Sequence, residues 1–239
     1  TTVRRLTRPV APCSDDVDTD VASAASAEAA AHAAAMSQAP GPQAAADEQS
    51  ADEPRAAFES SIVLPVLRFV SQGFGERALK DVLDALPEPA RDVFASGVSS
   101  DSWVPWYAVN ALVQEVDARL GRDDLHLIAQ CGHAAAEGAF ERMRALRSSL
   151  PGPELLLAEI PTTMQQLLWG TSWVVHHVGR GYGRLEVVER QPASLPTCVW
   201  SLGFLEESLD RVGAKEIEVN LTSCRALGDP SCVLDVTWL

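Results

Sequence analysis

The hydrophobic pattern of this chain changes period near residue 170, and that change constrains the fold more than any other feature. Between about 58 and 169 the apolar residues recur at the three- and four-residue spacing of helices. From 172 onwards they alternate with polar residues, as in half-buried strands, apart from one further helical segment. This order predicts an α+β domain, in which a helical layer of about six helices packs on a small, mostly antiparallel sheet and one more helix is inserted between two strand pairs.

Glycine and proline set the expected limits of these elements, because both residues interrupt regular structure. Pro65 is expected in the first turn of its helix, where a proline is tolerated. The glycine-rich stretch 179–183 is expected to be a hairpin turn rather than a phosphate-binding loop, since no helix follows it. The expected helices cover about 62–70, 76–86, 87–97, 105–120, 124–150, 154–169 and 195–212, and the expected strands 172–177, 184–189, 216–222 and 232–238.

Residues 1–55 differ in composition from the rest of the chain. Two acidic clusters flank an alanine-rich run at 21–36, and the stretch contains no Phe, Trp or Tyr. It offers too little apolar surface to offset the entropy lost on ordering. We therefore expect a disordered acidic, alanine-rich tail at 1–55, with Cys13 exposed in it, and a folded domain at 56–239. The alternative is a docking segment that folds on a protein partner.

Bulk composition excludes several classes of protein. The net charge of −14 disfavours nucleic acid and anionic membranes as partners, because both attract basic proteins. The apolar runs are too short and too interrupted for a membrane span, and no apolar core follows the N-terminal arginines as in a signal peptide. Five cysteines in 239 residues are odd in number and sparse, which favours reduced thiols and a cytoplasmic protein.

Three cysteines near the C-terminus carry the most specific chemical signal. Cys198, Cys224 and Cys232 have the spacing C-x25-C-x7-C. The first lies at the start of an expected helix, and the other two flank the loop between the last two strands, so the three thiols can converge. Thiolates gathered in this way bind zinc well, because Zn²⁺ accepts a tetrahedron of soft ligands.

This arrangement resembles the 4-vinyl reductase-like (V4R) family, which includes sensor domains of bacterial regulators. The resemblance is specific over about 170–239, and the family is related in fold to haem–nitric-oxide-binding domains and to vesicle-tethering (TRAPP) subunits. In its zinc-bearing members a glutamate stands three positions before the middle cysteine, whereas this chain has Leu221 there. The matching residues are Cys198 with Gly203, Gly213, and the Cys224-x3-Gly228-x3-Cys232 signature.

Three interpretations of the cysteines stay open at this point. They bind structural zinc, with Glu218, Asp235 or a water as the fourth ligand; they are buried reduced thiols left from an ancestral site; or Cys224 and Cys232 form a disulfide. A closed thiolate site leaves no position for activated water, so none of these interpretations is catalytic.

The resemblance further implies an apolar pocket between helices and sheet for a small aromatic or pigment-like molecule. Residues expected to line it are Trp173, His177, Tyr182 and Trp200. Haem is expected not to bind, because the sequence has no Tyr-x-Ser-x-Arg motif and no clearly placed histidine ligand.

The function predicted from the sequence is a non-enzymatic small-molecule-sensing or regulatory module. No nucleophile elbow, HExxH motif or phosphate-binding loop is present, which disfavours an enzyme. The expected partners are a small apolar or aromatic ligand, a protein contacted through the tail, and a second copy of the chain. The alternative is a dimerisation scaffold resembling TRAPP subunits. A tetrapyrrole vinyl reductase is a third candidate, implied only by the family's name.

Overall fold

The computed structural model describes residues 56–122, 124–146, 152–189, 192 and 194–239. The predicted disordered tail at 1–55, with Cys13, lies outside the described residues, as do the last residues of the helix expected to end at 150. The described residues belong to one compact unit, which begins at residue 54. None of the described helices is long and apolar enough to cross a membrane.

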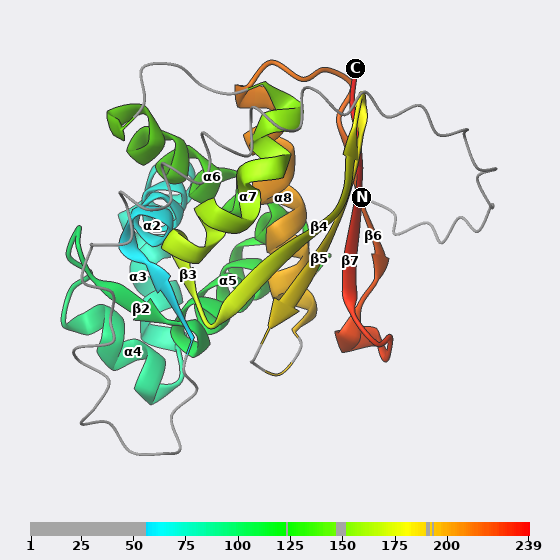
Figure 1. Ribbon diagram of the computed structural model, residues 1–239. Coiled ribbons are helices and arrows are strands. Elements are labelled where there is room, and N and C mark those ends of the chain that lie inside the picture. The colour runs from blue at the N-terminus through cyan, green and yellow to red at the C-terminus, as the bar shows by residue number, and fades with distance from the viewer. Residues whose placement is uncertain (1–55, 123, 147–151, 190–191, 193) are drawn as a thin grey trace, which may run out of the picture. The chain divides into compact units, whose positions relative to one another are not determined.

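Seven α-helices form among the described residues, in the predicted order (Figure 1). Proline in the first turn begins α4, α7 and α8, because proline there gives up no helical hydrogen bond. The helices are α2 (Ser60–Phe74), α3 (Glu76–Ala85), α4 (Glu88–Ala95), α5 (Trp106–Leu120), α6 (His126–Leu146), α7 (Pro153–Leu167) and α8 (Leu195–Arg211).

Pro65 lies further inside its helix than the sequence predicted, because α2 already begins at Ser60. Proline has no N–H, so the carbonyl of Ser61 loses its helical donor. That carbonyl lies against Gly138 of α6, where an added Cβ would stand 1.9 Å from the Ser61 oxygen. The proline and the glycine therefore act together, and they let α2 and α6 pack backbone against backbone.

The contact between α6 and α8 is equally close and also depends on glycine. A Cβ on Gly132 of α6 would lie 2.1 Å from the carbonyl oxygen of Trp200. A Cβ on Gly203 of α8 would lie 2.0 Å from the carbonyl oxygen of Ala129. Distances this short are impossible for real side chains, so the two glycines fix how α8 lies on the helical layer.

The described residues form two antiparallel sheets. A small one, which the sequence did not predict, has the order β2-β1-β3 and joins segments far apart in the chain. The larger one has the order β4-β5-β7-β6, with α8 placed between its two strand pairs in the sequence. The strands are β1 (Ala57–Glu59), β2 (Trp103–Pro105), β3 (Leu168–Trp169), β4 (Thr171–Gly179), β5 (Tyr182–Glu189), β6 (Glu218–Ser223) and β7 (Cys232–Thr237).

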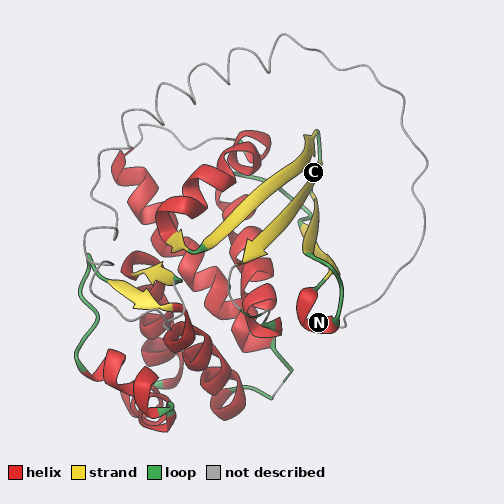
Figure 2. Cartoon of the chain, turned by 60° about the horizontal axis from the view of Figure 1, so that its bottom comes forward, coloured by secondary structure: helices red, strands yellow, loops and turns green. Residues whose placement is uncertain are grey.

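The helices cover one face of the four-stranded sheet, which we call its inner face (Figure 2). Helix α7 packs along β4, and α8 packs against β6. A Cβ on Gly183 of β5 would meet the side chain of Leu157 from α7 at 2.7 Å, which shows how tightly the layers fit. The buried core lies between this face and the helices, and the prediction of an α+β fold is confirmed.

Candidate functional site

The three cysteines of the C-terminal motif meet at one point between α8 and the sheet. The Sγ atom of Cys198 lies 3.6 Å from that of Cys224 and 3.6 Å from that of Cys232. All three sulfur atoms lie within 4.8 Å of one another, and all three residues are buried. Sulfur ligands at about 2.3 Å around a tetrahedral zinc ion stand about 3.8 Å apart, so this spacing suits one shared ion.

Strand register and a short loop position two of these thiols. Cys232 begins β7 opposite Val187, which in turn lies opposite Trp173, so the three share one rung of the inner face. The backbone N–H of Cys224 donates to Oδ2 of Asp229 at 2.8 Å, which closes the loop between β6 and β7. The backbone N–H of the next residue, Arg225, donates to Sγ of Cys232 at 3.4 Å.

One thiol of the cluster has a shifted pKa. Burial raises the pKa of the Cys198 thiol far above its usual range, and the neighbouring Cys232 and Cys224 raise it further. At neutral pH the thiol of Cys198 therefore carries its proton, and binding of a metal ion must displace it. The affinity for such an ion then depends on pH.

The space beside the three thiols is lined mostly by apolar side chains. A narrow crevice beside the thiols, too small to admit water, is lined by Val187, Cys198, Ser201, Leu221, Cys232 and Leu234. The two carboxylates considered from the sequence do not reach it: Glu218 is exposed, and Asp235 accepts hydrogen bonds from Tyr182 and Arg184. Among the His, Cys, Asp and Glu residues that the structure describes, only the three cysteines converge here.

Trp173 and Trp200, two of the expected pocket residues, lie in the buried core. Each is 3 % exposed, and neither indole Nε1 finds an acceptor among the described residues. Trp200 packs edge-on against Phe58 with ring centroids 5.5 Å apart, and it stacks on Phe204 at 5.2 Å. Both indole N–H groups are therefore donors enclosed in an apolar interior.

His177 and Tyr182, the other two expected pocket residues, lie on the outer face of the sheet. A bulge between Val175 and His177 shifts the register, so that His177 lies opposite the outward-facing Arg184 and is exposed. The rings of His177 and Tyr182 lie 5.6 Å apart, and the Tyr182 hydroxyl donates to Oδ1 of Asp235 at 3.0 Å. The structure thus brings these two residues together, but not with Trp173 and Trp200.

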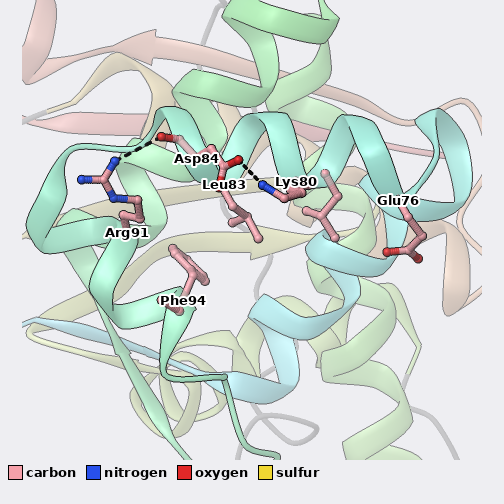
Figure 3. A pocket seen from close by; sticks show the side chains of 8 residues that line it. Glu76, Lys80, Leu83, Asp84, Arg91 and Phe94 are labelled. Carbon is pink, nitrogen blue, oxygen red and sulfur yellow. Dashed lines mark hydrogen bonds and ion pairs between the residues drawn. The ribbon is translucent and has the colours of Figure 1, made fainter.

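A groove between α3 and α4 has no counterpart in the sequence analysis (Figure 3). It has a volume of about 270 Å³ and an apolar floor that includes Leu83 and Phe94. Charged side chains rim it: Lys80 pairs with Asp84, and Arg91 donates to the backbone carbonyl of Asp84 at 3.3 Å. Two short helices with ordinary amphipathic patterns give no sequence signal for a groove between them.

No family model and no curated protein matches this sequence. Solved structures do match its fold. An H-NOX protein from S. oneidensis in the Fe(II) ligation state aligns with a TM-score of 0.61 and 15% identity, over 76% of this chain and 96% of that one. Fe(II) unliganded H-NOX from K. algicida gives 0.59 and 13%, over 76% and 96%. An oxygen-binding H-NOX domain related to soluble guanylate cyclases gives 0.51 and 13%, over 75% and 94%.

These matches correct one prediction and support others. The expectation against haem is wrong, because the solved structures with this fold are haem-type H-NOX domains described in iron ligation states. The predicted relation in fold to haem–nitric-oxide-binding domains is confirmed.

Haem iron needs an axial ligand from the protein, and histidine is a common one. His133 is half-buried, and His126, His176 and His177 are exposed, so none of the described histidines offers a buried axial imidazole in this conformation. The described histidines therefore do not fit a haem iron in this conformation. At the level that 13–15% identity supports, the comparisons establish the fold of the described residues as that of H-NOX domains.

Proposed function

We propose that this chain is a non-enzymatic, cytoplasmic sensing module that holds a small molecule between its helical layer and its four-stranded sheet. The observation that carries the proposal is that the buried indole N–H groups of Trp173 and Trp200, like that of Trp106 in α5, have no acceptor among the described residues. A buried donor without an acceptor costs about 1–3 kcal/mol, and folded proteins rarely keep one without a use. A ligand with an apolar body and an acceptor oxygen would remove that cost.

The fold supports this assignment. H-NOX structures with this architecture are described with NO and with oxygen bound, so the architecture accommodates small ligands in those proteins. The V4R resemblance adds small aromatic effectors as a ligand class. Residues 1–55 are then the part of the chain that would pass the signal to a protein partner.

The cysteine cluster has a structural role in this proposal. A metal ion shared by Cys198 of α8 and by Cys224 and Cys232 of the β6–β7 hairpin would clamp the helix to the sheet. Helix α8 also carries Trp200, so the clamp would fix one wall of the ligand site. The V4R resemblance suggests zinc, and the bound ion would contribute its binding free energy to folding.

Titration calorimetry against small phenols and against haem tests the ligand site, with Trp173→Phe and Trp200→Phe as variants. Loss of one indole donor is expected to weaken binding about tenfold, because one hydrogen bond contributes about 1 kcal/mol or slightly more. Trp103→Phe is the matched control, since Trp103 lies in β2 of the small sheet. Folded wild-type protein that binds neither phenols nor haem would contradict the proposal.

A dimerisation scaffold is the second candidate, and the outer edge of the sheet favours it. Strand β4 ends the sheet, so one of its backbone edges is unpaired, and Val174 on it is 40% exposed. Sedimentation of the wild type beside Val174→Lys separates the two functions. A wild type that is dimeric and a Val174→Lys variant that is monomeric would favour the scaffold. If both proteins are monomeric, the chain does not dimerise through the edge of β4.

A further inference from the structure

The cysteine cluster offers three sulfur ligands to an ion. The two Sγ–Sγ distances of 3.6 Å from Cys198 show that one ion can contact all three sulfurs without rearrangement of the backbone. No fourth His, Cys, Asp or Glu converges with them among the described residues. The cluster therefore suits an ion that needs three ligands and no more.

Leu221 stands at the position where the zinc-bearing members of the V4R family have a glutamate, three residues before Cys224. Its side chain lines the crevice together with Cys198 and Cys232, and the crevice is too narrow for a water molecule. The hydroxyl of Ser201, which also lines it, already donates to the carbonyl of Thr197 at 3.0 Å. Zinc in a structural site is almost always four-coordinate, so this environment leaves it one ligand short.

The net charge of the occupied site also favours a three-coordinate trivalent ion over zinc. Cys198 is 6% exposed, and Cys224 and Cys232 are each 1% exposed, so any net charge on the occupied site is buried. Three thiolates around a divalent ion leave a net charge of minus one, whereas three around a trivalent ion leave none. Burying an uncompensated charge is costly, which favours the neutral complex.

We propose that the three-thiol site takes a trivalent, thiophilic ion of the arsenite class, an inference that rests on the metal-binding part of the proposed function. Trivalent arsenic is satisfied by three sulfur ligands in a pyramid, and its lone pair faces the fourth direction. Here Leu221 lines the crevice beside the thiols, and its apolar side chain demands no coordination. The site would then be a sensing site in itself, because occupation ties α8 to the β6–β7 hairpin.

The binding reaction balances without any oxidant or reductant. Arsenous acid, As(OH)₃, reacts with three thiols to give As(SR)₃ and three water molecules. Three S–H and three As–O bonds break, three As–S and three O–H bonds form, and arsenic stays trivalent. Each thiol proton leaves in a water molecule.

The loop that joins Cys224 to Cys232 lies largely at the surface. The short 3-10 turn Arg225–Leu227 follows Cys224, and Leu227 in it is 65% exposed. Gly228 then adopts a left-handed conformation with φ 94°, which returns the chain towards β7. Opening this loop would expose Cys224 and Cys232 while the strands stay paired.

The test compares arsenite with zinc on the reduced, full-length chain under anaerobic conditions. Elemental mass spectrometry after desalting is expected to find about one arsenic per chain, with the loss of three titratable thiols. In competition, arsenite should displace zinc from the wild type. Leu221→Glu, which supplies a fourth ligand, should raise the affinity for zinc at least about tenfold and weaken binding of arsenite, while Leu221→Gln controls for side-chain size.

Cysteine variants show where the ion binds. Cys232→Ser and Cys224→Ser should abolish binding, whereas Cys131→Ala, which removes a buried thiol of α6, and Cys13→Ser should leave it unchanged. Circular dichroism confirms that each variant is folded. Zinc held by four ligands in preference to arsenite would overturn the arsenite proposal and leave the metal clamp standing. A folded wild type that binds neither ion would overturn both.

Discussion

The two faces of the four-stranded sheet differ in how their polar groups are paired. On the outer face, the Tyr182 hydroxyl and the Arg184 guanidinium both contact Asp235, at 3.0 and 3.1 Å. His176 on the same sheet pairs with Glu186 at 2.8 Å. On the inner face, the indole N–H of Trp173 has no acceptor among the described residues.

The thiols beside the inner face also differ from the polar groups of the outer face. Cys232 lies on the same rung as Trp173, and together with Cys198 it forms a cluster that an ion would complete. The outer groups already have partners or face solvent, so they need nothing further. The inner face thus carries an indole donor without an acceptor among the described residues and borders a thiol cluster that an ion can bridge, so function is to be sought there.

The largest expected difference between the faces is in stability. Leu234→Ala on the inner face removes a side chain that is 1% exposed, and it should lower the free energy of unfolding by about 2–5 kcal/mol because a cavity remains. Val188→Ala on the outer face, where the side chain is 46% exposed, should change it by about 0.5 kcal/mol or less. Urea denaturation measures both changes in the free energy of unfolding. Equal changes would mean that the two faces do not differ in their contribution to stability.

The outer polar network should contribute less than the core. Asp235→Ala removes the acceptor shared by Tyr182 and Arg184, and it should lower the free energy of unfolding by about 1 kcal/mol. The Arg184 side chain is 44% exposed, so solvent screens its ion pair. Adding 1 M salt should reduce the difference between wild type and variant. A loss as large as that of Leu234→Ala would mean that the outer face also carries core structure.

The smallest effect is a shift in the titration of Tyr182. Burial, followed by the hydrogen bond to Asp235, raises the pKa of its hydroxyl, and Arg184 opposes the shift. A raised pKa in the folded state stabilises the protein below the unfolded pKa of about 10, and this contribution is lost as pH rises through the folded value. Phenolate absorbance in Tyr107→Phe, which leaves one of two tyrosines, should give a midpoint above about 10.

The Asp235→Asn change provides the control for that titration. Removing the carboxylate should move the midpoint of Tyr182 back towards its ordinary value, because the charge no longer disfavours the phenolate. A midpoint at or below about 10 in the Tyr107→Phe background would contradict the assigned environment.

Local patterns in the sequence predicted the elements but not the contacts between distant ones. The alternation from 216 to 222 and from 232 to 238 predicted β6 and β7, since a two-residue period is a local property. The small sheet was missed because β1, β2 and β3 have two or three residues each, too few to show a period. The bulge before His177 was missed for a related reason: one extra residue reverses the face of those that follow and leaves no compositional mark.

The sequence by itself determined that this chain is an α+β protein, with three cysteines placed where an inserted helix and a hairpin can meet. Both follow from periodicity and spacing, which are properties of neighbouring residues. Only the tertiary structure decided that Leu221 lines the crevice beside the thiols, that Trp173 and Trp200 are enclosed without acceptors among the described residues, and that His177 faces outward. The positions of Leu221 and His177 depend on strand register, and that of Trp200 on the close approach of α6 and α8 at Gly132 and Gly203. Such contacts are set by packing between segments far apart in the chain.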